Sequence, residues 1–75
     1  MRELLLFIAK AVVDNPDQVE VCEERDALGV TLKLTVAQSD IGKVIGKQGR
    51  IAKAIRTLVR AASPYEDNVQ VEIIA

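Results

Sequence analysis

Two glycines enclose one basic residue and one amide at the start of a predicted helix, in the segment Gly46–Gly49. Helix N-termini carry a partial positive charge and normally attract Ser, Thr, Asp, Asn or early acidic residues. Here Lys47, Arg50 and Lys53 crowd the first turns instead. Each of these charges destabilises a helix by a few tenths to about 1 kcal/mol unless an anion is bound nearby. Because glycines also leave backbone N–H groups accessible, the segment is typical of a phosphate-binding site.

The spacing of the glycines excludes two common nucleotide-binding loops. A P-loop requires G-x-x-x-x-G-K followed by Ser or Thr, but only three residues separate Gly42 from Gly46, and Gln48 stands where the hydroxyl is required. The dinucleotide fingerprint G-x-G-x-x-G is absent, and Lys43 argues against a transmembrane G-x-x-x-G contact. The remaining pattern is helix, G-x-x-G, helix, which contacts a nucleic-acid backbone in KH domains. An ordinary glycine-rich turn between two helices is the alternative interpretation.

The distribution of charge favours a nucleic-acid partner, although the formal net charge of −1 does not. Six acids and one base lie between Ala11 and Val30, whereas six bases and no acid lie between Ile41 and Arg60. A charge run is often only a solvated face, but solvated helix faces usually mix both signs. The acid-free run surrounds the G-x-x-G segment, so we interpret it as a surface that binds phosphates.

Hydrophobic periodicity predicts an α+β domain with the element order α-β-β-α-α-β. The predicted helices are Arg2–Asp14, Asp40–Ile45 and Arg50–Ala62, and the predicted strands are Val19–Glu23, Val30–Val36 and Val69–Ile74. Because the strands mostly have one apolar and one polar face, we expect the helices to cover one face of a three-stranded sheet. Residues 1–75 are interpreted as a single domain, because no linker or internal repeat divides them.

Polar residues and prolines mark the predicted ends of these elements. Pro16 stops the first helix, because proline lacks the N–H donor and restrains the residue before it. A polar turn is predicted over Arg25–Gly29, and Asp40, together with the serine before it, is predicted to cap the second helix. Pro64 excludes further helix, and Glu66–Asn68 are predicted to form a turn.

The longest helix after the glycines is predicted to have two distinct faces. Its apolar face, expected to be buried, consists of Ile51, Ile55, Leu58 and Ala62. Its basic face, roughly opposite, consists of Lys53, Arg56 and Arg60. Cys22 falls on the polar face of the first strand between two glutamates, where a reactive thiolate is disfavoured, so we expect a small space-filling residue.

Composition excludes several other classes of protein. The chain is 49% hydrophobic and 28% charged, which is typical of a soluble globular fold. One cysteine allows no internal disulfide, and the absence of histidine removes the commonest general base and metal ligand. The longest apolar run, Leu4–Ala9, is too short to span a bilayer, and no signal-peptide cleavage site follows it. We therefore expect a cytoplasmic, non-enzymatic protein with no metal or other cofactor.

The segment Val44–Ile51 resembles the signature of KH domains, with apolar residues before the loop and a polar pair with one base between its glycines. The element order is similar to the type II KH arrangement, and the similarity extends over all 75 residues, including Asp14–Pro16 and Ile41–Arg56. The chain thus resembles the small bacterial single-KH proteins of the KhpA family. This resemblance implies RNA binding, a role as an RNA chaperone, a homodimer, a KhpB-like KH-containing partner, and a link to cell-wall and cell-length control.

The resemblance also implies roles for residues of the loop and its flanks. Gly46 and Gly49 would give the RNA backbone access, while Lys47 and Gln48 would contact its phosphates. Three further bases would flank the path of the strand electrostatically: Lys43, Arg50 and Lys53.

Two isoleucines one helical turn apart, Ile41 and Ile45, are candidates for an apolar floor beneath the bases, although at least one of them is expected to lie in the core. The aromatic residues Phe7 and Tyr65 are far from the loop in sequence. Stacking on aromatic platforms is therefore not the expected mechanism. A groove for about four nucleotides, with aliphatic contacts and hydrogen bonds to base edges, fits the residues better.

Two functions are compatible with these residues. The first is single-stranded RNA binding through Gly46–Gly49. The alternative is a protein-interaction (dimerisation) module with only weak or incidental RNA binding. Leu4–Ile8 has more apolar positions than one helix face needs, and a domain of this size buries only about 60% of its unfolded surface, so pairing would stabilise it. An enzyme is disfavoured, because no nucleophile and base can be paired from these residues.

Overall fold

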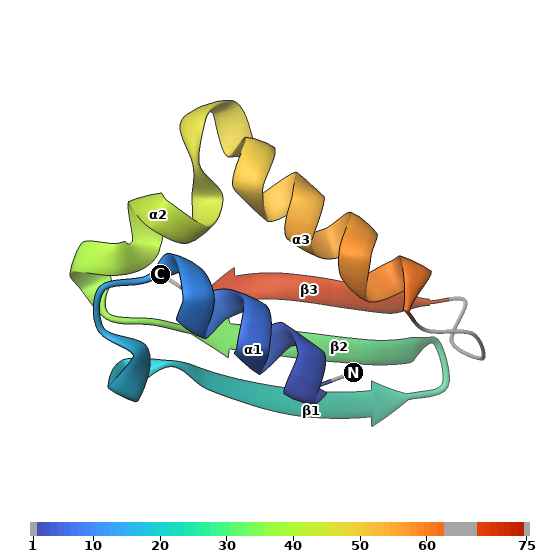
Figure 1. Ribbon diagram of the computed structural model, residues 1–75. Helices are drawn as coiled ribbons and strands as arrows, with labels where there is room; N and C mark the ends of the chain where they lie inside the picture. Colours follow the sequence, from blue (N-terminus) through green and yellow to red (C-terminus); the bar gives the residue numbers. More distant parts are fainter. Residues whose placement is uncertain (1, 63–67, 75) are drawn as a thin grey trace.

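A sheet and a layer of helices make up the part of the chain that the structure describes. The computed structural model describes residues 2–62 and 68–74; Pro64, Tyr65, Glu66 and Asp67, where the sequence predicts a helix stop and part of a turn, lie outside them. The helices are α1 (Arg2–Val12), α2 (Ile41–Ile45) and α3 (Arg50–Ala61), and the strands are β1 (Glu20–Asp26), β2 (Gly29–Thr35) and β3 (Val69–Ile74). These elements confirm the predicted α+β class and the α-β-β-α-α-β order (Figure 1).

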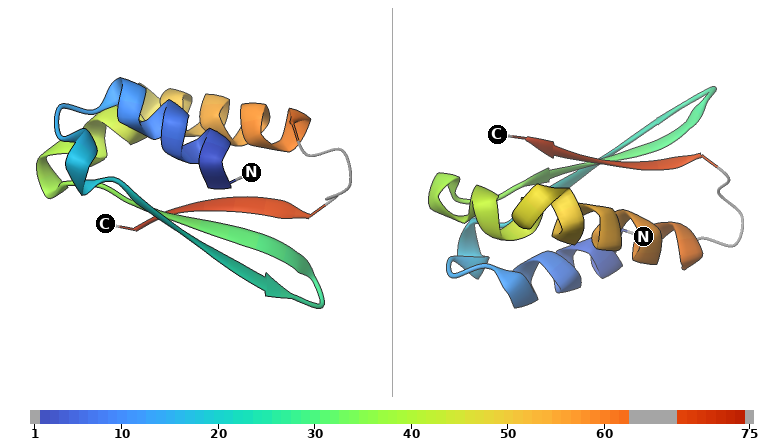
Figure 2. Two further views of the ribbon diagram at one scale, coloured as in Figure 1. Left: turned by 60° about the horizontal axis from the view of Figure 1, so that its bottom comes forward. Right: turned by 90° about the horizontal axis from the view of Figure 1, so that it is seen from above.

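The described residues form a three-stranded sheet with β2 in the centre. β1 and β2 form an antiparallel hairpin, whereas β2 and β3 run parallel. Parallel neighbours require a long crossover connection, which α2 and α3 supply here. The crossover places α3 on the same face of the sheet as α1, and Figure 2 shows these two helices side by side over that face.

The core lies between the helix layer and the inner face of the sheet. Leu32 and Leu34 of the central strand are fully buried, as the period of two predicts. Their cross-strand partners are Val71 on β3 and Val21 on β1, respectively. The helices contribute Leu5, Ala9, Val44, Ile55 and Val59. Cys22 is exposed on the opposite face of the sheet, as the alternation of β1 predicts.

The first strand is longer than its sequence predicts. β1 continues to Asp26, whereas the sequence predicts an end at Glu23 and a turn over Arg25–Gly29. The turn is narrower because Asp26 Oδ1 accepts hydrogen bonds from the N–H groups of Leu28 and Gly29, at 2.8 and 3.1 Å. The outer half of β1 is charged and exposed, so it carries no apolar alternation from which a strand could be recognised.

The buried face of α3 is also different from the prediction. Its buried residues are Ala52, Ile55 and Val59. Ile51 and Leu58 are 38% and 53% exposed, and Ala62 is exposed as well. The apolar surface of α3 is wider than its contact with the sheet. Leu58 therefore lies beside α1 at the outer surface, while Ile51 lies against the glycine loop.

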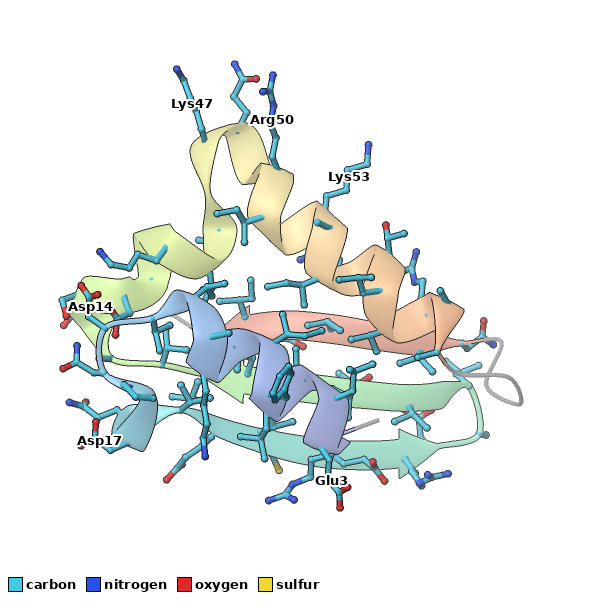
Figure 3. All side chains as sticks on the ribbon, viewed as in Figure 1. Glu3, Asp14, Asp17, Lys47, Arg50 and Lys53 are labelled. Carbon is cyan, nitrogen blue, oxygen red and sulfur yellow. The ribbon has the colours of Figure 1, made fainter. Side chains whose placement is uncertain are left out.

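Arginine side chains from the helix layer cover both open edges of the sheet. On β1, Arg2 donates from Nε to the carbonyl oxygen of Val21 at 3.0 Å. On β3, the corresponding bonds are Arg56 Nε to Val71 O at 3.2 Å and Arg60 Nε to Val69 O at 3.3 Å. The sequence predicts that Arg56 and Arg60 share a basic face with Lys53, on the surface interpreted as binding phosphates. Instead the two guanidinium groups reach the sheet, whereas Lys53 extends away from it (Figure 3).

A buried carboxylate joins the end of α1 to the start of α2. Asp40 is 1% exposed and accepts hydrogen bonds from the backbone N–H groups of Asp14 and Asn15 and from Asn15 Nδ2, at 3.2, 3.0 and 3.0 Å. Asp40 occupies the N-cap position of α2, as predicted, but its side chain forms no capping bond to that helix. Its oxygens are occupied by donors of the α1–β1 connection, so Asp40 fixes where α2 begins.

These contacts set the protonation behaviour of Asp40. Burial raises the pKa of this carboxyl group, but the hydrogen bonds from Asn15 and Asp14, helped by the charge of Lys43, outweigh burial. They hold the pKa below its ordinary value near 3.8. Because the pKa of Asp40 is lower in the folded protein than in the unfolded chain, its carboxylate stabilises the fold fully at pH values above the unfolded pKa. This stabilisation is lost as the pH falls through the folded pKa.

Replacement of Asp40 by asparagine is expected to lower the melting temperature at neutral pH by at least about 5 °C. An amide NH2 would face the donors of Asn15 and leave one of them without an acceptor. The variant should also lose less stability than the wild type between about pH 5 and pH 2, because it lacks the titrating carboxylate. Thermal melts across that range measure both effects, with Asp17→Asn as the exposed control. If the melting temperatures of the wild type and Asp40→Asn depended equally on pH, the depressed pKa of Asp40 would be contradicted.

Candidate functional site

The loop between α2 and α3 is shaped by glycines with positive φ. Gly46 has φ 74° and ψ 176°, and its N–H donates to the Gly42 carbonyl oxygen at 2.9 Å, which ends α2. A Cβ at this position would lie 2.6 Å from Cγ1 and 2.9 Å from Cβ of Ile51. Gly49 has φ 74° and ψ 15° and begins α3. Position 46 therefore accepts only glycine unless the first turn of α3 moves.

Gln48, between the glycines, also adopts a left-handed conformation, with φ 58° and ψ 26°. This conformation costs a residue with a Cβ about 1–2 kcal/mol. Such strain persists where the surrounding structure enforces it, and it is concentrated at functional sites. The side chain is exposed, and its Oε1 lies 3.5 Å from Arg50 Nη2. The loop thus presents a strained, exposed amide side chain at its tip.

Three basic side chains extend from this loop and the first turns of α3. Lys47, Arg50 and Lys53 point away from the sheet into open space (Figure 3). Within residues 2–62 and 68–74, none of them forms an ion pair. The labelled acids lie away from these three side chains: Asp14 and Asp17 are at the connection between α1 and β1, and Glu3 is at the start of α1 (Figure 3). The site therefore concentrates uncompensated positive charge around accessible backbone, which suits a chain of phosphates.

Lys43, which the sequence places among the flanking bases, has a different environment. Its Nζ lies 3.2 Å from Asp14 Oδ2, and both side chains are exposed. Exposed ion pairs contribute little free energy, but this pair compensates the charge of Lys43. The basic residue of α2 therefore differs from those of the loop and α3. Lys47, Arg50 and Lys53 form the group whose positive charge is uncompensated.

A groove of about 420 Å³ lies beside the loop, between α3 and the open edge of β3. It is lined by Ile45, Gly49, Ala52, Arg56, Gln70, Val71, Glu72 and Ile73. Two isoleucines give it apolar walls, Gly49 and Ala52 leave space, and Arg56 supplies hydrogen-bond donors. Such a groove can hold a flat apolar ring whose rim carries hydrogen-bonding atoms.

The structure places the two candidate floor residues differently. Ile45 is 37% exposed and lines the groove. Ile41 packs against the hydrophobic core. Ile41 begins α2 and Ile45 ends it, so two residues on one face of the helix have different neighbours: the core at its start and the groove at its end.

Several groove residues are missing from the sequence-based site: Ala52, Arg56 and the segment Gln70–Ile73. In the sequence, Ala52 resembles an ordinary helix residue, and Arg56 resembles one more member of the basic face of α3. The position of β3 beside α3 depends on a parallel pairing across more than thirty intervening residues. The only sequence signal for this wall of the groove is the alternation of apolar and polar residues in β3. That alternation identifies a strand but does not show which element lies beside it.

The described residues contain neither a candidate metal cluster nor a membrane-spanning helix. Among them, no group of three or more His, Cys, Asp or Glu side chains could hold a metal ion. The helices in this part of the chain are all too short or too polar to cross a membrane.

Comparison with known proteins gives a consistent result. Residues 2–74 match the family model described as KhpA/KhpB, KH domain. The chain is 60% identical over 75 residues to the RNA-binding protein KhpA of Caldanaerobacter subterraneus subsp. tengcongensis, covering 99% of this chain and 100% of the relative. It is 56% identical to the protein of the same name from Clostridium acetobutylicum, with the same coverage. It is 45% identical over 73 residues to that of Chlamydia trachomatis, covering 97% of this chain and 92% of the relative.

Proposed function

This chain belongs to the KhpA/KhpB KH-domain family, and from that premise we propose that it binds single-stranded RNA through the loop Gly46–Gly49 and the adjacent groove. The observation that carries the proposal is the loop itself. Its first glycine has no room for a Cβ, and three uncompensated bases surround it. In KH domains a G-x-x-G loop contacts the nucleic-acid backbone over about four nucleotides. The names of the relatives, RNA-binding protein KhpA, support the same ligand.

The geometry supports different roles for the loop, which would bind phosphates, and the groove, which would bind nucleobases. The backbone at Gly46 and Gly49 allows a phosphate to approach closely, and Lys47, Arg50 and Lys53 compensate its charge. The bases of the strand would then enter the groove between Ile45 and Ile73. None of the groove-lining residues is aromatic, so affinity comes from phosphate contacts and aliphatic packing rather than from stacking.

The salt dependence of binding tests this mode. We expect the affinity for a short fluorescein-labelled RNA, measured by anisotropy, to fall with a log–log slope of roughly −2 to −3, which is about −0.7 for each of a few phosphate contacts. Lys53→Ala should make the slope shallower by about one contact. Lys10→Ala, an exposed base on α1, is the control and should leave the slope unchanged. A flat response of the wild type to salt would contradict phosphate binding.

A second function, self-association, is favoured by an exposed apolar surface on the helix layer. Phe7 is 73% exposed and Leu58 is 53% exposed. They lie in a shallow hollow that is lined by Leu4, Phe7, Ile8, Leu58, Ala61 and Ala62, the α1–α3 patch. Contiguous exposed apolar surfaces mark interaction sites. We propose that this patch forms a homodimer, and that the loop at the start of α3 stays accessible because Leu58 lies two turns further along that helix.

Dilution of the protein tests the homodimer. Sedimentation equilibrium across the micromolar range is expected to show a reversible dimer for the wild type and a monomer for Phe7→Ala, because truncation removes apolar area from the contact. Leu28→Ala is the matched control, since Leu28 is 80% exposed at the hairpin turn, outside the patch. A wild type that stays monomeric throughout would contradict the proposal.

The remaining roles in our proposal rest on the family resemblance. They are action as an RNA chaperone in the cytoplasm, partnership with a KhpB-like KH-containing protein, and participation in cell-wall and cell-length control, without enzymatic activity. A single KH domain contacts few nucleotides and is therefore expected to bind weakly. Weak, rapidly reversible contacts suit a chaperone, and a second KH-containing chain would add binding surface.

A further inference from the structure

One guanidinium group lies in the groove rather than beside the phosphate-binding loop. Arg56 lines the groove together with Ala52, one helical turn before it, and its Nε donates to the carbonyl oxygen of Val71. This bond holds the planar group against the edge of β3. A guanidinium has five N–H donors. The four on its terminal nitrogens have no acceptor within residues 2–62 and 68–74.

Glu72 is the other charged residue that lines the groove, but within residues 2–62 and 68–74 it forms no ion pair with Arg56. Glu72 pairs in register with Lys33 of β2, and its charge raises the pKa of that lysine, which places the carboxylate with the outer face of the sheet. The other lining residues are aliphatic, glycine or an amide. A base that enters the groove therefore meets the free donors of Arg56 as its principal hydrogen-bonding group.

We propose that Arg56 reads one base of the bound strand and selects cytosine or guanine over adenine. These two bases present adjacent acceptors, O2 and N3 in cytosine and O6 and N7 in guanine, which a guanidinium can bond in pairs. Adenine places an amino donor beside each of its ring acceptors N1 and N7, so one guanidinium N–H would face a donor. This inference rests on the proposed RNA binding and adds the specificity of the groove.

Arg60 provides a matched control. It follows Arg56 by one turn of the same helix and makes the same kind of bond, from Nε to the Val69 carbonyl oxygen at 3.3 Å. Arg60 is not among the residues that line the groove. Substitution of either arginine removes an equivalent contact with the sheet edge, so a difference between them reports on the groove.

The experiment measures dissociation constants for equal-length oligo(C) and oligo(A) RNA at one salt concentration. We expect the wild type to prefer oligo(C) by about ten-fold or more. Arg56→Lys keeps the charge but cannot form the paired bonds, so the ratio should fall towards one while the salt slope stays the same. Arg60→Lys should keep the wild-type ratio. Arg56→Gln serves as a second variant, and thermal melts identify the folded proteins that are compared.

The outcomes separate the two levels of the proposal. RNA binding by the wild type with equal affinity for both oligonucleotides would overturn the inference and leave RNA binding intact. A preference that survives in both Arg56 variants would overturn it as well, as would an equal loss in Arg56→Lys and Arg60→Lys. Failure of the wild type to bind either oligonucleotide would overturn the proposed function itself.

Discussion

Replacement of both Lys47 and Gln48 by aspartate is expected to weaken RNA binding by more than about 100-fold while the protein remains folded. The two changes turn the tip of the loop from positive to negative, and like charges facing phosphates cost several kcal/mol. The same changes should not harm α3. Acidic residues near a helix N-terminus are favourable, and aspartate tolerates the left-handed conformation of position 48 better than most residues with a side chain.

The control for this variant has the same change in net charge at a distant surface. Lys10→Asp with Gln18→Asp adds an equal negative charge on exposed positions outside the loop and groove. Anisotropy titrations should show near wild-type affinity for this control, and thermal melts should lie within a few degrees for all three proteins. If the distant pair weakens binding as much as the loop pair does, total charge governs affinity and the loop has no special role.

Substitution of Gly46 by alanine is expected to destabilise the fold by about 2 kcal/mol or more and to impair RNA binding. The cost combines the positive φ of this position with a Cβ that would lie 2.6 Å from Ile51 Cγ1. To relieve that contact, the first turn of α3 must shift, and Arg50 and Lys53 shift with it. Urea unfolding gives the change in stability, and titration with RNA gives the change in affinity.

Other glycines in the same region provide a graded comparison. A Cβ added at Gly42, inside α2, would meet nothing within 4 Å outside its own helix, so Gly42→Ala should be neutral or stabilising by up to about 1 kcal/mol. Gly49 is equally open but has φ 74°, so Gly49→Ala should cost about 1 kcal/mol. The Gly42→Ala variant is therefore expected to be the most stable, Gly49→Ala intermediate and Gly46→Ala the least stable. Equal stability of the position 42 and 46 variants would contradict the role of Ile51.

Local signals in the sequence were sufficient for most of the fold. The alternation of β2 predicts its bounds to within one residue, and the glycines mark where α2 ends and α3 begins. Errors arose where a residue's role depends on distant neighbours. Asp40 resembles a helix cap in sequence, but its hydrogen bonds go to Asp14 and Asn15, twenty-six and twenty-five residues earlier. Local propensity cannot contain that information.

The same contrast between local signals and long-range contacts applies to the candidate site. The loop could be identified because Gly46–Gly49 break the ordinary rules of helix initiation within a few residues. The groove could not be identified from the sequence, because its second wall belongs to β3 and the sequence does not show which strand lies beside α3. Arg56 illustrates the limit most clearly. Its spacing from Lys53 and Arg60 predicts a shared basic face, and only the position of the Val71 carbonyl group explains where its guanidinium lies.

The arginines over the sheet edges also restrict how the protein can assemble. An edge strand with unoccupied carbonyl groups is a template for further strands, and repeated addition leads to fibrils. An incoming strand would have to displace the charged donor of Arg2 on one side, or those of Arg56 and Arg60 on the other. Addition of a strand is thus disfavoured at Val21 on one edge and at Val69 and Val71 on the other. The homodimer that we propose would instead use the α1–α3 patch, and pairing of two copies through one patch on each gives a closed assembly.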